Sequence, residues 1–151
     1  MREILFRGKT KVIAGSEYNM GKPDGEWVRG YLYNDVGCWK IRQFEMSYAD
    51  YIGYEVDPET VGQYTGLRDR NGKKIFEGDI VTTKYKLGRG GYYTFEVYYN
   101  ENLCQFALTI NSGSYTKNKQ YDWLQLTALK ANKIEVIDNI HDNPELMRGD
   151  V

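Results

Sequence analysis

The stretch that decides the fold is Val61–Val81, with the sequence VGQYTGLRDRNGKKIFEGDIV. At its centre lies Asn71-Gly72, the dipeptide that best tolerates positive φ at both central positions of a type I′ turn. Such a turn joins two antiparallel strands with the right-handed twist that they require. We therefore predict a hairpin whose strands lie near residues 62–69 and 73–76.

A second turn and a third strand are expected directly after this hairpin. Residues 77–79, with the sequence EGD, are typical of a tight turn. The β-branched run at 80–83, IVTT, favours an extended and partly buried strand, and residues 134–140 are expected to be the closing strand. These elements predict a small barrel of about five strands, SH3-like in topology.

Alternation of apolar and polar residues with period two predicts further strands on both sides of this stretch. A second hairpin is expected between residues 94–99 and 104–110, with its turn at 100–102. Nearer the N-terminus, a strand has Trp27, Arg29, Tyr31 and Tyr33 on one face and Val28, Gly30 and Leu32 on the other. After a turn at 34–37, the same pattern continues in a further strand.

Helical signals are short. Residues 57–59 and 143–145 each combine an Asx cap with a proline at the first helical position, which predicts a single turn of helix at each place. The segment 120–131 is compatible both with a strand and with a short helix.

The predicted fold class is mainly β, with only short helical turns. We place a domain boundary at Asp57–Thr60, so that an N-terminal β-rich region spans residues 1–60 and a C-terminal small SH3-like barrel spans residues 61–151. The 151 residues are enough to bury a core without disulfides. No apolar run approaches the roughly 20 residues that cross a bilayer, and the N-terminus is charged, so we expect a cytoplasmic protein.

Five segments resemble, in order, segments of a known family. They are Met1–Lys9 (MREILFRGK), Gly25–Leu32 (GEWVRGYL), Tyr54–Thr60 (YEVDPET), Val61–Val81 and Ile134–Leu146 (IEVIDNIHDNPEL). Together they resemble the YopX family, small proteins of temperate phages and prophages of Gram-positive bacteria. The resemblance covers most of the chain and implies no established biochemical activity. The family more usually has Gly and Tyr where this chain has Asp138 and His141, which argues against an essential role for His141.

The distribution of charge suggests a first functional hypothesis. The net charge of −1 is unevenly distributed along the chain. Residues 1–60 contain 8 Lys and Arg and 10 Asp and Glu, and residues 134–151 contain 1 and 5. Residues 61–133 contain 11 and 6, so this middle part is net positive. Cations and tyrosines interleave in the glycine-rich run 84–93, KYKLGRGGYY. In a loop, cations neutralise phosphates and aromatic rings stack on unpaired bases. The candidate nucleic-acid-binding residues are Lys84, Tyr85, Lys86, Arg89 and Tyr92.

The alternative for this run is that its cations are solvated loop charges and its tyrosines belong to strand faces. A second hypothesis is a protein interaction module, such as a homo-oligomer, because tyrosine-rich β surfaces supply rigid contact area at low entropic cost. The expected partner is thus nucleic acid, a second copy, or a phage or host protein, and no membrane.

Signals for catalysis are weak. His141 is the single histidine, and although Asp138 and Asp142 flank it, no nucleophile accompanies it. Glu77 and Asp79 enclose a glycine, where acidic side chains ordinarily accept hydrogen bonds from turn amides. We expect a non-enzymatic protein with no catalytic residues, no metal and no cofactor.

The two cysteines form no motif. Cys38 and Cys104 lie far apart and have no CxxC or histidine-paired spacing. We expect reduced thiols that behave as small buried hydrophobes.

Overall fold

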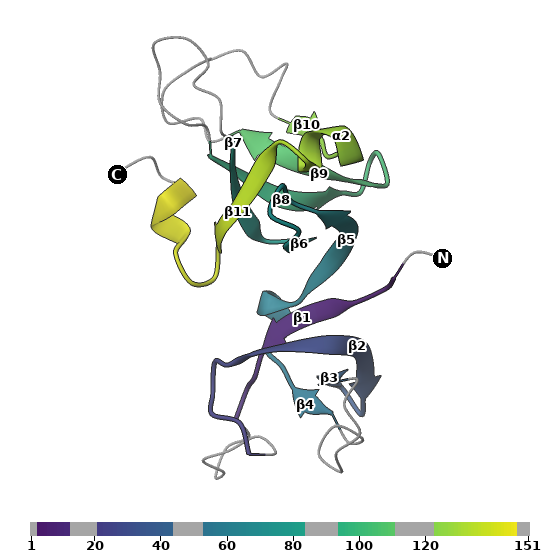
Figure 1. The fold of residues 1–151 in the computed structure, drawn as a ribbon. Coiled ribbons are helices and arrows are strands. Elements are labelled where there is room, and N and C mark those ends of the chain that lie inside the picture. Colours follow the sequence, from purple (N-terminus) through teal and green to yellow (C-terminus); the bar gives the residue numbers. More distant parts are fainter. Residues whose placement is uncertain (1–2, 13–20, 44–52, 84–93, 111–122, 148–151) are drawn as a thin grey trace. The chain divides into compact units, whose positions relative to one another are not determined.

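The computed structural model describes residues 3–12, 21–43, 53–83, 94–110 and 123–147 (Figure 1). The described residues are mainly β, as predicted, and the strand pairings identified among them are antiparallel. The chain divides into two compact units, Met1–Tyr64 and Thr65–Val151. The boundary predicted from the sequence lay at Asp57–Thr60. Among the described residues, no helix has the length and apolar character needed to cross a membrane.

The first unit is built on one antiparallel sheet. Its strands are β1 (Phe6–Lys9), β2 (Trp27–Asp35), β3 (Cys38–Arg42), β4 (Tyr54–Glu55) and the beginning of β5 (Gly62–Arg68), in the order β4-β3-β2-β1-β5. One side of the sheet forms the core of this unit, where Val28, Ile41 and Val56 are almost fully buried. Because side chains alternate along each strand, the residues between these positions point to the opposite side.

A short 3-10 helix, η1 (Pro58–Thr60), links β4 to β5. Its N-cap is Asp57, whose side chain accepts a hydrogen bond from the backbone N–H of Glu59. The helical turn predicted at residues 57–59 is therefore confirmed, and proline occupies the first turn, where its missing N–H costs nothing.

The turn between β2 and β3 has the geometry of a type I′ turn. Val36 (φ 49°) and Gly37 (φ 86°) both have positive φ, as that turn requires, and the side chain of Asn34 accepts a hydrogen bond from the Gly37 N–H. The predicted turn at 34–37 is confirmed. Val36 is 98% exposed and β-branched, so its side chain strains the backbone and gains no burial in return.

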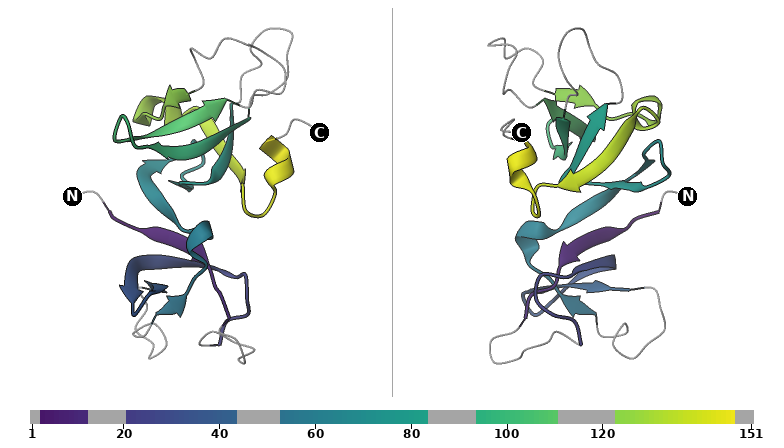
Figure 2. Two further views of the ribbon diagram at one scale, coloured as in Figure 1. Left: turned by 180° about the vertical axis from the view of Figure 1, so that it is seen from behind. Right: turned by 60° about the vertical axis from the view of Figure 1, so that its left-hand side comes forward.

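The second unit contains a five-stranded sheet and a hairpin. The sheet has the order β10-β9-β8-β7-β11 and consists of β7 (Asp79–Thr83), β8 (Thr94–Asn100), β9 (Gln105–Ile110), β10 (Trp123–Gln125) and β11 (Ile134–Asn139). The pairing of β11 with β7 can be followed in Figures 1 and 2. The predicted strands at 80–83 and 134–140 and the predicted hairpin of β8 with β9 are confirmed.

Both interpretations of the segment 120–131 are partly correct, because β10 is followed by the short helix α2 (Ala128–Ala131). The helical turn predicted at residues 143–145 is present as η3 (Pro144–Met147). The core of this unit is a cluster of apolar side chains from its strands and α2: Ile75, Val81, Phe95, Val97, Phe106, Leu108, Leu126, Ala131, Ile134 and Val136.

The hairpin of β5 with β6 (Lys74–Phe76) is confirmed, but its predicted turn type is wrong. Of the turn residues, Gly72 alone has positive φ, at 81°, whereas a type I′ turn would also need positive φ at Asn71. The physical reason is the buried carboxylate of Asp69. Its Oδ1 accepts hydrogen bonds from the N–H groups of Asn71 (2.8 Å) and Lys73 (2.9 Å) and so holds the loop in a different conformation.

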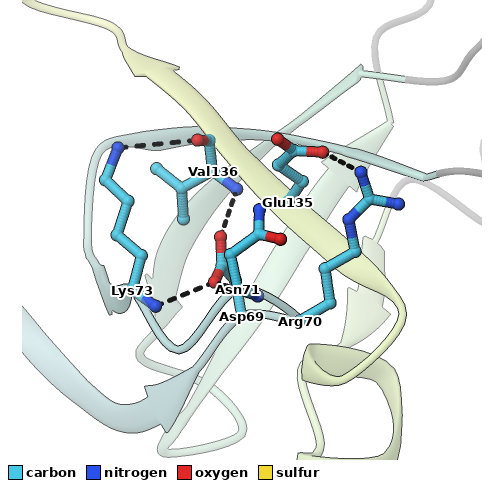
Figure 3. A network of polar contacts seen from close by, with 6 residues as sticks. All are labelled: Asp69, Arg70, Asn71, Lys73, Glu135 and Val136. Carbon is cyan, nitrogen blue, oxygen red and sulfur yellow. Dashed lines mark hydrogen bonds and ion pairs between the residues drawn. The ribbon is translucent and has the colours of Figure 1, made fainter.

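The same carboxylate fixes the hairpin to β11. Asp69 Oδ2 accepts a hydrogen bond from the N–H of Val136 at 3.0 Å (Figure 3). The N–H of Arg70 donates to the carbonyl of Ile134. An ion pair between Arg70 and Glu135 adds a contact at the surface. Asp69 is only 3% exposed, and hydrogen bonds to a buried charged group are stronger than neutral ones.

These contacts explain why the second unit is not the closed barrel that the sequence predicted. Residues 61–151 contain seven described strands, β5 to β11, where about five were predicted. The described residues show no pairing between the outer strands β10 and β11. Closure would need the outer edge of β11, and at Ile134 and Val136 that edge is already bonded to the turn at residues 69–73. The SH3-like topology stays a prediction.

We predict that Val36→Asn stabilises the protein. Asparagine tolerates positive φ far better than valine and would complete the Asn-Gly pair that type I′ turns favour. The free energy of unfolding should rise by about 1 kcal/mol, measured by urea denaturation. The variant Val36→Ala keeps a side chain unsuited to this conformation and should gain clearly less. An equal gain in both variants would contradict the explanation by backbone strain.

We predict that Asp69→Asn destabilises the protein by about 1–3 kcal/mol. An amide has one accepting oxygen where the carboxylate has two, so at least one of the three bound N–H groups would lose its partner. Asp57→Asn is the control, because Asp57 accepts from the Glu59 N–H at an exposed site. Equal losses in urea denaturation of the two variants would show that burial of the Asp69 carboxylate is not the cause.

Candidate functional site

The first unit has a sheet side on which cations and aromatic rings gather. We call it the basic aromatic face, and it consists of Arg7 and Lys9 of β1, Trp27, Arg29, Tyr31 and Tyr33 of β2, and Lys40 and Arg42 of β3. The register places these residues together, because Lys9 lies opposite Trp27, Arg42 opposite Tyr31 and Lys40 opposite Tyr33. Directly opposed residues of an antiparallel pair point to the same side of the sheet.

The basic aromatic face lies on the side of the sheet away from the core of its own unit. Val28 and Ile41, which alternate with its residues, are buried in that core. The centre of the face is open, since Tyr31 is 54% exposed and Arg29 and Arg42 are exposed. Arg7, in contrast, is buried, with 7% of its surface exposed.

Cations of the face lie against its aromatic rings. The guanidinium carbon of Arg7 is 4.9 Å from the centroid of the Trp27 ring, and the ammonium nitrogen of Lys9 is 5.6 Å from the same centroid. The guanidinium of Arg42 is 5.4 Å from the centroid of Tyr33. These distances lie within the range of cation–π attraction, which orients the long side chains and limits their freedom.

The backbone at Gly30 sets the position of Arg42. A Cβ at Gly30 would lie 1.8 Å from the carbonyl oxygen of Arg42, so no other residue fits there without moving β3. Gly30 therefore allows β3 to approach β2 closely at the point where Arg42 and Tyr31 lie opposite each other.

The charge of the face differs in sign from that of the surrounding sequence. Five of the eight Lys and Arg residues in 1–60 lie on this side of the strands, against two acids, Asp35 and Glu55, which leaves a net charge of +3. The whole of residues 1–60 has a net charge of −2, from 8 cations and 10 acids. The cations are thus concentrated on one side of one sheet.

Two arginines of the face lie directly opposite each other. Arg7 and Arg29 are cross-strand partners in the pairing of β1 with β2. Like charges in this position destabilise a sheet, by an amount similar to the roughly 0.2–1 kcal/mol that opposite charges contribute.

Lys40 has an acidic partner at the end of the hairpin. Its ammonium group is 2.6 Å from the carboxylate of Asp35. The hydrogen bond to Asp35 raises the pKa of Lys40 and keeps it charged. Its charge is therefore largely balanced locally.

The loop residues singled out from the sequence, Lys84, Tyr85, Lys86, Arg89 and Tyr92, lie outside the described residues. The basic aromatic face was not identified as a site from the sequence, although the alternation of Trp27, Arg29, Tyr31 and Tyr33 was. The additional signal is that cations recur with the same period of two at residues 7 and 9 and at residues 40 and 42.

The residues around His141 form a hydrogen-bonded loop end. Asn139 accepts from the N–H of His141 at 3.0 Å, and the Asn139 side chain donates to Asp142 at 2.6 Å. Asp138 accepts from the side chain of Asn143 at 2.6 Å. The two acids that flank His141 in the sequence therefore each accept a hydrogen bond from an asparagine side chain.

The remaining polar candidates from the sequence, an acidic turn residue and the two cysteines, show no arrangement typical of a catalytic or metal site among the described residues. Asp79 accepts a hydrogen bond from the Phe76 N–H at 2.7 Å, as expected of a turn residue. Cys38 and Cys104 are free thiols, and because Cys38 is only partly buried and Cys104 is exposed, the expectation that both are buried is wrong. In the described part of the chain, no three His, Cys, Asp or Glu side chains lie close enough to hold a metal ion.

Together these observations define a class: a small, mainly β protein of two compact units, one of which has a basic aromatic sheet face. The chain belongs to the YopX family, whose model, described as YopX protein, matches residues 12–148. The family resemblance found in the sequence motifs is thereby confirmed.

Among solved structures, the chain is similar to the crystal structure of protein EF1440 from Enterococcus faecalis, with 20% sequence identity and a TM-score of 0.45. The match covers 97% of this chain and 99% of that chain. Comparison with curated proteins gives no match.

We predict that Glu96→Gln stabilises the protein at neutral pH but not in acid. Partial burial, and secondarily the nearby Glu77 carboxylate, raise the pKa of Glu96 in the folded state. The charged form therefore costs stability above this raised pKa, and the cost disappears as the pH falls and Glu96 becomes protonated. Below the ordinary glutamate pKa of about 4.3, wild type and variant should be equally stable.

Thermal melts across this pH range measure the effect. Glu101→Gln is the matched control, because Glu101 lies in the exposed turn between β8 and β9. A gain at neutral pH that persists unchanged in acid would show that packing, and not the charge on Glu96, is the cause.

Proposed function

We propose that this protein is a non-enzymatic binding module of phage or prophage type that acts in the bacterial cytoplasm and binds nucleic acid through the basic aromatic face. The observation that supports the proposal most strongly is the segregation of charge. Five cations lie on one side of a sheet in a region whose net charge is −2. Such a concentration of cations is the electrostatic feature that surfaces for nucleic acid share.

A polyanion matches this face better than a compact anionic ligand does. The cations occupy three neighbouring strands, so phosphates would be bound at several separate points along a chain and not at one. Each phosphate neutralised by Lys or Arg releases counterions, which gives affinity that falls steeply with salt. The aromatic rings among the cations are the second component that surfaces for single-stranded nucleic acid use.

The run at residues 84–93 is proposed as a separate, second candidate for contact with nucleic acid. Its sequence combines Lys84, Lys86 and Arg89 with Tyr85 and Tyr92, the same two kinds of side chain as the basic aromatic face. The overall pI near 5.9 implies that binding depends on these local concentrations of cations and not on the net charge of the protein.

The alternative proposal is a homo-oligomeric interaction module without nucleic-acid contact. Exposed aromatic side chains such as Tyr31, Trp39 and Tyr99 favour it, because aromatic residues are enriched in protein interfaces. Light scattering of the purified protein separates the proposals: a strict monomer that binds nucleic acid contradicts the alternative, and an oligomer without such binding supports it.

We predict that Arg29→Glu weakens nucleic-acid binding. The variant removes a phosphate-binding cation and repels phosphate, so affinity should fall by about tenfold or more and the dependence of log affinity on log salt should become shallower by about 1 or more. The new acid would lie opposite Arg7, where opposite charges attract, and a thermal melt checks that the variant keeps its fold.

Fluorescence anisotropy of labelled single-stranded DNA, duplex DNA and RNA over a salt series measures the affinity. Lys133→Glu is the control, because it changes the net charge by the same amount at an exposed position in the second unit. If Arg29→Glu binds like wild type while the triple variant Lys84→Glu, Lys86→Glu, Arg89→Glu does not bind, the contact belongs to the run at 84–93. If wild type binds none of the probes at low salt, the nucleic-acid proposal is wrong.

A further inference from the structure

We infer that the ligand of the basic aromatic face is single-stranded nucleic acid and that Tyr31 stacks on one of its bases; this inference rests on the proposed function. Tyr31 is 54% exposed, whereas Trp27 and Tyr33 of the same strand are partly buried. It is thus the aromatic residue of the face with the largest surface open to a ligand. Stacking on such a ring needs an unpaired base with an open face.

The position of Tyr31 in the sheet fits this role. It lies in the interior of the nine-residue strand β2, where hydrogen bonds to β3 hold the backbone in place. A residue on a paired strand presents its ring in a fixed direction, so little conformational entropy is lost when a base stacks on it. Sheet surfaces with exposed aromatic residues bind single-stranded RNA in this manner in other folds.

The neighbours of Tyr31 supply the phosphate contacts that a stacked nucleotide needs. Arg42 lies directly opposite it on β3, and Arg29 lies two residues earlier on the same side of β2, roughly 6–7 Å along the strand. Both arginines are exposed. A nucleotide whose base stacks on Tyr31 would therefore lie between two arginines that can contact its phosphates.

A duplex can make the phosphate contacts of this arrangement but not the stacking contact. Its phosphates can contact Arg29 and Arg42, but its bases are stacked on one another and offer no face to Tyr31. Duplex binding should therefore depend on the cations alone, and single-strand binding on both the cations and the ring. This difference separates base stacking from general attraction to polyanions.

We expect Tyr31→Ala to weaken the binding of a labelled oligothymidine by about tenfold at constant salt. The affinity of the variant for a duplex of equal length should equal that of wild type. The dependence of its oligothymidine affinity on salt should also stay unchanged. Tyr31→Phe retains the ring and should bind the oligothymidine like wild type. Because more than half of Tyr31 is exposed, the fold should tolerate both changes, and a thermal melt of each variant checks this.

The outcomes separate this inference from the proposed function. If wild type binds the single strand and the duplex, and Tyr31→Ala lowers neither affinity, the proposed function stands and the stacking role of Tyr31 is wrong. Equal weakening of both probes by Tyr31→Ala also overturns the inference, since a duplex has no base to stack. If wild type binds neither probe at low salt, the proposed function fails first.

Discussion

The carboxylate of Asp69 is the interaction on which the second unit depends most. It accepts three backbone N–H groups, two from its own turn and one from β11, at a position that is 3% exposed. The residues it joins are far apart in sequence, because Asp69 and Val136 are separated by 67 positions. One side chain thus shapes the hairpin and attaches it to the last strand of the sheet. Removing it would leave buried N–H groups without acceptors, which costs more than the loss of an exposed hydrogen bond.

The strands and turns could be predicted from the sequence where the information is local. The β8–β9 hairpin and the turns of helix at 57–59 and 143–145 follow from alternation, β-branching and capping residues within a few positions. The type of the turn at Asn71-Gly72 could not, because it depends on where the Asp69 side chain points. The conformation expected there is found instead at Val36-Gly37, where no local preference of valine favours it.

The basic aromatic face could not be predicted from the sequence for the same reason, because it too depends on residues that are distant along the chain. The alternation on β2 was visible in the sequence, but the opposition of Arg7 to Arg29 and of Arg42 to Tyr31 depends on the register between strands that are distant along the chain. Register is set by the whole sheet and its buried side, not by the residues of one strand. A charge count over residues 1–60 even has the opposite sign to the face that the fold creates.

The bonded edge of β11 has a consequence for the behaviour of this protein in a crowded cell. A sheet edge with unsatisfied N–H and C=O groups is a template on which further chains can add as strands, and this is a route to fibres. At Ile134 and Val136 the edge is occupied by the chain's own turn at residues 69–73. The segment that specifies the fold therefore also protects this part of the sheet against aggregation.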